Sequence, residues 1–157
     1  MAKSTKRFSL EYNSKEKLYI LSIKDNGSNI SISDIYEECN DTEVFSKGKN
    51  DEIIIREPIK IKYNNKRKNI KIDFQRCIFE KRIYFTNCEF NGNVFFNHAI
   101  FYKYADFHES IFNGIVSFYN AEFKVAPNFS TCKFLYLRIC QSTRDKFYQC
   151  KNREFGF

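Results

Sequence analysis

The stretch IDFQRCIFEKRIYFTNCEFNGNVFFNHAIF, residues 72–101, decides the fold because phenylalanine recurs in it at alternating intervals of five and six residues. The series continues without a gap to Phe134, so the true period is eleven residues. Neither interval fits the 3.6-residue turn of an α-helix, and these side chains would spread around a helix instead of forming one face. A fixed period of this kind indicates a stack of like structural units. The series consists of Phe74, Phe79, Phe85, Phe90, Phe96, Phe101, Phe107, Phe112, Phe118, Phe123, Phe129 and Phe134.

Two further columns each precede a phenylalanine by two residues. The first column holds Ile72, Ile83, Val94, Ala105, Val116 and Pro127, and the second holds the small residues Cys77, Cys88, Ala99, Ser110, Ala121 and Cys132. Two inward side chains separated by one outward side chain suit a very short strand. The residues therefore predict a coil of parallel β-structure that spans six repeat units.

The repeat resembles that of the pentapeptide-repeat family, A-(D/N)-(L/F)-x-x. Ala105–Glu109 (ADFHE) and Pro127–Thr131 (PNFST) match it well, and Ile72–Arg76 (IDFQR) matches it more loosely. The resemblance implies an all-β fold, a right-handed quadrilateral parallel β-helix with four faces per coil. The extra residue in every second unit resembles a Phe-rich branch of the family. Two units of eleven residues then make one coil, and we expect about three coils with the phenylalanines stacked in four ladders.

Three regions follow from this pattern: a β-rich capping region (1–71), the β-helix (72–137) and a C-terminal cap (138–157). The first column fails at Arg138 and Cys140 replaces the next phenylalanine, so we expect the coils to end there. Residues 135–139 can add a last strand. We expect a capping helix to follow, from Ser142 or Thr143 to about Asn152.

The sequence of the N-terminal region predicts secondary-structure elements outside the repeat. Residues 7–23 read as a hairpin, Ser33 as the cap of a short helix, and 40–51 as a loop. Strands are expected at 52–56 and 59–63, on either side of Pro58. Tyr63 lies two units before Phe85, which puts it in register with the Phe85 ladder. We expect this region to cover the open end of the first coil.

Composition narrows the classes of protein that remain. The net charge of +7 is divided into +4 for residues 1–71, zero for 72–137 and +3 for 138–157. The chain has no apolar run long enough to span a membrane and no signal peptide at its start, so we expect a cytoplasmic protein. Three of the six cysteines lie in the small column, which favours free buried thiols over disulfides or a metal site. No sequence motif predicts a cofactor.

The main functional expectation is a non-enzymatic scaffold that binds another protein through the outer faces of the β-helix. The two histidines, His98 and His108, fall at outward positions, and the repeat places no nucleophile beside His108 and Glu109. We therefore expect no catalytic residue. The outward residues that could carry a contact include Arg76, Lys81, Arg82, Lys103, His108 and Glu109.

Three alternatives stay open. The family resemblance implies a DNA mimic that binds a type II topoisomerase such as gyrase, although a neutral tower in a basic chain does not favour it. An edge-to-edge dimer through a coil end is another. The third is nucleic-acid or anionic-surface binding through a basic run. That run consists of Lys60, Lys62, Lys66, Arg67, Lys68 and Lys71.

Overall fold

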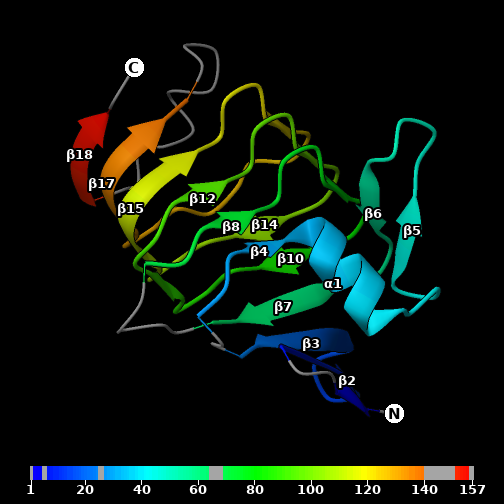
Figure 1. Ribbon diagram of the computed structural model, residues 1–157. Helices are drawn as coiled ribbons and strands as arrows, with labels where there is room; N and C mark the ends of the chain where they lie inside the picture. The colour runs from blue at the N-terminus through cyan, green and yellow to red at the C-terminus, as the bar shows by residue number, and fades with distance from the viewer. Residues whose placement is uncertain (1, 5–6, 25–26, 64–68, 140–150, 156–157) are drawn as a thin grey trace.

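Short parallel strands wind around one hydrophobic core in about four turns, which makes a β-solenoid (Figure 1). The computed structural model describes residues 2–4, 7–24, 27–63, 69–139 and 151–155. One short helix, α1 (Ile32–Cys39), accompanies the strands.

The strands form three sheets, which are the walls of the solenoid. Sheet A contains, in spatial order, β1 (Ala2–Ser4), β2 (Phe8–Asn13), β3 (Leu18–Ile23), β7 (Ile59–Lys62), β10 (Ile83–Tyr84) and β14 (Ala105–Asp106). Sheet B contains β18 (Lys151–Phe155), β17 (Lys133–Arg138), β15 (Ile111–Ser117), β12 (Val94–Phe95), β8 (Ile72–Asp73) and β4 (Ile30–Ser31), with β11 (Glu89–Phe90) also paired to β15. Sheet C contains β16 (Glu122–Phe123), β13 (Ile100–Phe101), β9 (Ile78–Phe79), β6 (Ile53–Ile55) and β5 (Phe45–Lys47).

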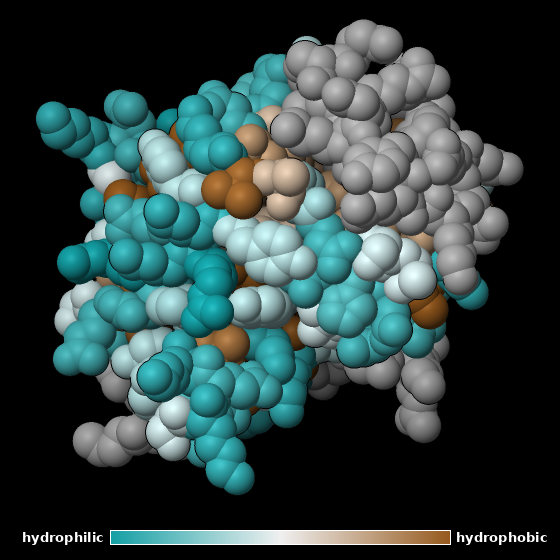
Figure 2. Space-filling model, turned by 180° about the vertical axis from the view of Figure 1, so that it is seen from behind, coloured by the Kyte–Doolittle hydropathy of each residue, from teal (hydrophilic) through white to brown (hydrophobic). Residues whose placement is uncertain are grey.

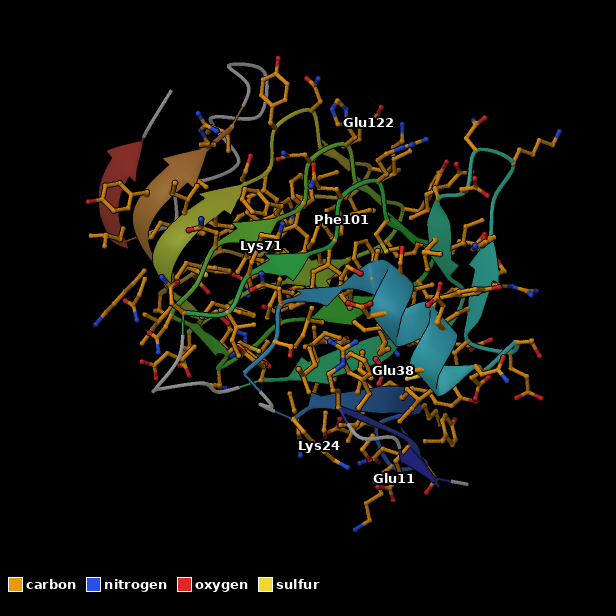
Figure 3. All side chains as sticks on the ribbon, in the orientation of Figure 1. Glu11, Lys24, Glu38, Lys71, Phe101 and Glu122 are labelled. Atoms are coloured by element: carbon orange, nitrogen blue, oxygen red, sulfur yellow. The ribbon has the colours of Figure 1, made fainter. Side chains whose placement is uncertain are left out.

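The register of the strands gives the length of a turn. Ile78 pairs with Ile100 and Ile100 with Glu122, so each turn takes two of the eleven-residue repeat units. This confirms the coil length and the parallel β-fold that the sequence predicts. The phenylalanine rings stack at this spacing in four ladders, at centroid distances between 4.6 Å (Phe79–Phe101) and 5.4 Å (Phe74–Phe96). Phe101 lies inside the ring of strands in Figure 3, whereas Glu122 lies at the periphery.

Residues of the small column form hydrogen bonds to the backbone as well as leaving room for the phenylalanine rings. Ser110 donates its hydroxyl proton to the carbonyl oxygen of Phe85, and the Cys132 thiol lies 2.6 Å from the carbonyl oxygen of Phe107. The Cys88 thiol lies 3.4 Å from the carbonyl oxygen of Ile61. These side chains therefore satisfy backbone acceptors of the preceding turn inside the core. The four cysteines of the described residues, Cys39, Cys77, Cys88 and Cys132, are buried and form no disulfide.

One residue in each repeat adopts the left-handed backbone conformation at the corner that follows the first phenylalanine. Its φ angle lies between 54° and 61° in Arg76, Asn87, His98, Glu109, Asn120 and Thr131. The turn is supported by the polar residue before the phenylalanine, because Asp73 Oδ1 accepts the Gln75 backbone N–H at 2.9 Å and Asn128 Oδ1 accepts that of Ser130 at 2.9 Å. The Asp/Asn position of the repeat thus acts as an Asx turn.

The N-terminal region adds a turn to the solenoid. Strand β7 pairs in parallel with β10, and β6 with β9, but Ile59 pairs with Ile83, so this turn is two residues longer than the later ones. The longer turn puts Ile61 beside Phe85 and moves Tyr63 onto Phe90, where the two rings stack at 5.3 Å. The expected register of Tyr63 with the Phe85 ladder is therefore wrong, because the two additional residues lie between these strands.

Other N-terminal expectations are confirmed or corrected. The hairpin of 7–23 is present as β2 and β3, which pair antiparallel. The helix α1 begins one residue before Ser33, and its N-cap is Ser31, so the predicted cap is wrong. The expected loop at 40–51 contains β5, which pairs antiparallel with β6. Together α1 and the hairpin cover the N-terminal end of the core, with Ile32 and Ile35 buried.

The last turn continues beyond the expected end of the coils. Leu137 pairs with Val116 after a register shift, and Leu137 and Ile139 are both buried. They take the two inward positions because the corner after Phe134 is one residue shorter than the corresponding corner after Phe112. The inward pattern therefore continues past Arg138, and β17 lies where the sequence predicts a last strand. Residues 151–155 form strand β18, where a helix was expected through Asn152, and the other expected helix residues and Cys140 lie outside the described residues.

The surface is mostly hydrophilic on the face seen in Figure 2, with separate hydrophobic residues among the polar ones. Among the described residues, no helix has the length and apolar character needed to cross a membrane. No group of three His, Cys, Asp or Glu side chains in that part of the chain converges as metal ligands would.

Candidate functional site

A hollow of about 370 Å³ lies on the outer side of sheet A, where strands of successive turns run side by side. We call it the sheet A hollow. Its lining comes from the β2–β3 turn, from strands β3, β7, β10 and β14, and from the corners next to them. The lining residues are Glu16, Leu18, Lys60, Arg82, Tyr84, Thr86, Asp106 and His108.

Strand register brings the central residues of the hollow into line. Lys60 pairs with Tyr84 and Tyr84 with Asp106, and Asp106 forms a bridge to Asn128. The neighbouring residues on each strand, such as Ile83 and Phe85, point into the core, so alternation along the strand turns these four side chains outward. Three residues of this outward column, Lys60, Tyr84 and Asp106, line the hollow in three successive turns.

Arg82 and Tyr84 form the centre of the hollow. The Arg82 Nη1 atom donates to the Tyr84 hydroxyl at 3.3 Å, and the guanidinium carbon lies 5.9 Å from the centre of the tyrosine ring. No carboxylate of the described residues lies within 4 Å of the Arg82 guanidinium. Tyr84 also packs edge-to-face on Tyr104 at 6.4 Å. Burial is the largest of several causes that raise the pKa of Tyr104.

His108 is held by Asp106 at one end of the hollow. The His108 Nδ1 atom lies 2.9 Å from Asp106 Oδ1, and the same oxygen accepts the His108 backbone N–H at 3.1 Å. Asp106 is only 8% exposed. Glu109, which the sequence placed beside His108, instead occupies the left-handed corner and is exposed. Within the described residues no hydroxyl or thiol is hydrogen-bonded to His108, so the pair has no adjacent nucleophile of the kind a triad needs.

The opposite end of the hollow carries an ion pair between Lys60 and Glu16, with Nζ and Oε2 2.8 Å apart. Asp106 and His108 are likewise engaged with each other. The charge of Arg82 is consequently the one in the hollow that lacks a carboxylate partner among the described residues. This gives the site a local preference for a negatively charged group on whatever binds there.

The described lysines of the basic run, Lys60, Lys62 and Lys71, do not lie on one sheet. Lys60 lines the sheet A hollow, Lys62 ends β7, and Lys71 precedes β8 on sheet B with its Nζ atom 5.9 Å from the Phe95 ring. Figure 3 shows Lys71 beside the strands of sheet B. Lys66, Arg67 and Lys68 lie outside the described residues. The described lysines of this run are thus divided between two sheets.

The other outward residues named from the sequence are dispersed as well. Arg82 and His108 line the sheet A hollow, while Lys81 and Lys103 line a second hollow of about 280 Å³ together with Glu80 and Tyr102. Arg76 donates to the Asn50 carbonyl oxygen at 3.3 Å. The sequence analysis did not name Tyr84, Asp106 or Glu16 as site residues. Of these, only Asp106 could have been found from the sequence, because it occupies the Asp/Asn position of the repeat.

The outward columns of the solenoid carry mixed charges. The residues facing out are Lys60, Tyr84, Asp106 and Asn128 on sheet A, and Glu89, Ile111 and Lys133, then Ser31, Asp73, Phe95, Ser117 and Arg138, on sheet B. The column of sheet A continues through Ile20 to Glu11, and Ile20, Lys60 and Tyr84 separate Glu11 from Asp106, so no two acidic side chains are neighbours in these columns. An acidic stripe, which a DNA mimic needs, is therefore lacking in these columns.

Comparison with known proteins identifies the repeat. Residues 74–122 match the family model described as pentapeptide repeats, in nine copies. A search of curated proteins and a search of solved structures each gave no match. The matched range covers the repeats that carry the phenylalanine ladders. It also includes Arg82, Tyr84, Asp106 and His108 of the sheet A hollow.

Proposed function

Because residues 74–122 of this chain are pentapeptide repeats wound into a β-solenoid, we propose that the protein is a non-enzymatic scaffold that binds another protein through the sheet A hollow. The observation that carries this proposal is the gathering of Tyr84, Arg82 and His108 in one hollow from successive turns. The fold supplies a rigid platform, and the outward column supplies the contact.

The residue types of the hollow support protein recognition. Tyrosine and arginine are enriched among the residues that dominate binding energy at protein interfaces, especially in pockets that exclude water. Tyr84 and Tyr104 pack on each other, and Arg82 lies against Tyr84, so these side chains lose little freedom on binding. A partner that places a carboxylate near Arg82 would complete the pairing of charges in the hollow.

The proposal assigns no reaction to the hollow and places the protein in the cytoplasm. The His108–Asp106 pair acts here as a structural contact that fixes the imidazole ring at the rim. The four described cysteines, which are buried and form no disulfide, fit a reducing compartment.

The test is a pull-down from lysate of the source organism with three forms of the protein. The Arg82→Ala/Tyr84→Ala variant removes the centre of the hollow. The Arg138→Ala/Tyr136→Ala variant removes the same residue types from β17 of sheet B and serves as the matched control. We expect a protein that the wild type and the control retain and that the hollow variant loses at least about tenfold.

Three other outcomes would contradict this proposal. Equal retention by all three forms would refute the sheet A hollow as the binding site. Loss of the partner after nuclease treatment would favour nucleic acid, whose phosphate contacts also weaken steeply with salt. Recovery of a type II topoisomerase would favour the DNA mimic in spite of the mixed charges on the outward columns.

A further inference from the structure

The outward column of sheet C differs from those of the other sheets because it is apolar. Ile54 pairs with Ile78, Ile78 with Ile100, and Ile100 with Glu122, so three isoleucines stand in line on the outer side of the sheet. All three are only partly buried. We call this column, Ile54, Ile78 and Ile100, the isoleucine face. A single exposed isoleucine needs no explanation, but a ladder of three on one flat sheet indicates a contact surface.

The corners that border the isoleucine face carry exposed aromatic and apolar side chains. Tyr102 is 45% exposed, Tyr119 52% and Val125 43%. The corner before the strands of sheet C carries Arg76, His98 and Asn120 in successive turns, and the corner after them carries Glu80, Tyr102 and Lys124. The two borders therefore differ in charge at the level of Ile78, where one holds a cation and the other an anion.

We propose that the isoleucine face pairs with the isoleucine face of a second copy of this chain, about a two-fold axis parallel to the axis of the solenoid. Such an axis keeps each turn at its own level, so isoleucine meets isoleucine at every step. It also reverses the strand direction, which brings each border of sheet C opposite the other border in the second copy. A two-fold interface requires this kind of self-complementary surface.

The borders are complementary under this operation. Arg76 comes opposite Glu80 of the second copy, His98 opposite Tyr102, and Asn120 opposite Lys124. One step further out, Tyr119 comes opposite Val125, so two of the exposed hydrophobic residues cover each other. No pair of like charges results at the borders.

The shape of one border fits the other. The hollow of about 280 Å³ lined by Glu80, Lys81, Tyr102 and Lys103 lies along the border that would receive Arg76 and His98 of the second copy. The Arg76 side chain is 59% exposed. Its Nη2 atom donates to the Asn50 carbonyl and lies 4.0 Å from Glu52 Oε2, which leaves the donors on Nη1 and Nε for Glu80 of the second copy.

Glu122 marks the end of the contact. It takes the outward position above Ile100, and its Oε2 atom lies 2.7 Å from the Lys124 Nζ atom. The two copies of Glu122 would face each other, each beside its own lysine. The pairing is consequently strongest over the turns of Ile54, Ile78 and Ile100.

A second copy is favoured over another occupant by the repeat itself. The isoleucines follow one another at the spacing of paired strands, about 4.8 Å, and an identical ladder has the same spacing at every step. Interfaces of proteins that associate weakly are only about as apolar as the rest of the surface.

The test is sedimentation equilibrium of the full chain at increasing concentration, up to about 1 mM. We expect a reversible dimer whose Kd rises about tenfold or more in Ile78→Lys and in Ile100→Lys. Ile111→Lys is the matched control, because Ile111 is an outward, partly buried isoleucine on sheet B. It should leave the Kd unchanged, and circular dichroism checks that each variant stays folded.

A charge exchange tests the two-fold axis with exposed residues alone. Arg76→Glu and Glu80→Arg should each weaken the dimer several-fold, and the double variant should restore it, since the contact is rebuilt with its charges reversed. A monomer at all concentrations would overturn the proposal. So would a dimer that Ile111→Lys abolishes while Ile78→Lys leaves it intact, or a double variant as weak as the single ones.

Discussion

Gly92 is the residue at which the solenoid leaves no room for a side chain. A Cβ atom at this position would lie 2.0 Å from the Ile70 carbonyl oxygen, a backbone atom of the preceding turn. Gly92→Ala must therefore move two turns apart, and we expect the free energy of unfolding to fall by about 2–3 kcal/mol. Urea unfolding followed by circular dichroism measures it.

The matched control for this prediction is Gly48→Ala. Its Cβ atom would meet the side chain of Glu52, which can rotate away, so we expect a loss below about 1 kcal/mol. Equal losses at both glycines would contradict the close approach of the backbones at Gly92.

Glu109 is an unfavourable residue for the corner that it occupies. Its φ angle is 59°, and two of the six equivalent corners carry asparagine, which accepts this conformation more readily. We expect Glu109→Asn to raise the free energy of unfolding by about 0.5–1 kcal/mol. Glu80→Asn is the control, because Glu80 is exposed but has no positive φ, and it should show no gain. A gain in both variants would mean that charge, and not backbone strain, is the cause.

Cys88 links stability to pH on the alkaline side. Burial raises the pKa of its thiol from 9.0 to about 12, so the folded protein keeps the proton longer than the unfolded chain does. The stabilisation is complete below pH 9 and is lost as the pH rises towards 12, at about 1.4 kcal/mol per pH unit. Cys88→Ala removes the titrating thiol and should therefore reduce this slope. Alanine fits the position, because it occupies the same column at Ala99 and Ala121. Identical slopes in the variant and the wild type would contradict the buried thiol.

Among the elements, α1 depends most on a single cap. The Ser31 hydroxyl oxygen accepts the Asp34 backbone N–H at 3.1 Å, and Asp34 Oδ2 accepts the Ser31 backbone N–H at 2.9 Å. We expect Ser31→Ala to lower the free energy of unfolding by about 1 kcal/mol. Ser33→Ala, the residue that the sequence suggested as the cap, should be neutral or slightly stabilising because it lies inside the helix. The reverse order of effects would contradict the assigned cap.

How far the sequence predicts the fold also depends on the element. The repeat strands were predictable because inward phenylalanines recur at a fixed interval, and packing in the core keeps that interval. The first turn was not, because isoleucines stand in place of the phenylalanines at Ile55 and Ile61 and the turn is two residues longer than the repeat would make it. A last strand over 135–139 was expected, but the inward positions of Leu137 and Ile139 were not, because a corner shortened by one residue shifts every later position of the pattern.

The sheet A hollow was only partly predictable for a related reason. Arg82 and His108 could be named as outward residues, because the repeat fixes which positions face the solvent. The predicted coil length aligns Tyr84 with Asp106, but Lys60 lies on a turn that is two residues longer, and its register with Tyr84 did not follow from the repeat. Recognition of such a site requires the register as well as the direction of each side chain.

At the scale of the whole molecule, one hydrophobic core joins the N-terminal strands to the repeats. Buried residues of β3, β6 and β7 belong to the same cluster as the phenylalanine ladders. Arg7 fixes the cap to this core, since its Nε atom donates to Glu38 Oε2 at 2.9 Å and its Nη1 atom donates to the Asn29 carbonyl at 3.1 Å. The first turn should therefore unfold together with the repeats and not as a separate unit.

Hydrogen exchange of the full chain, read by mass spectrometry, tests this continuity most directly. Peptides that cover residues 53–63 should be protected to about the same degree as peptides that cover 78–90, because the strands of both ranges pair with one another. Rapid exchange of 53–63 beside slow exchange of 78–90 would contradict a solenoid that begins before the phenylalanine repeat.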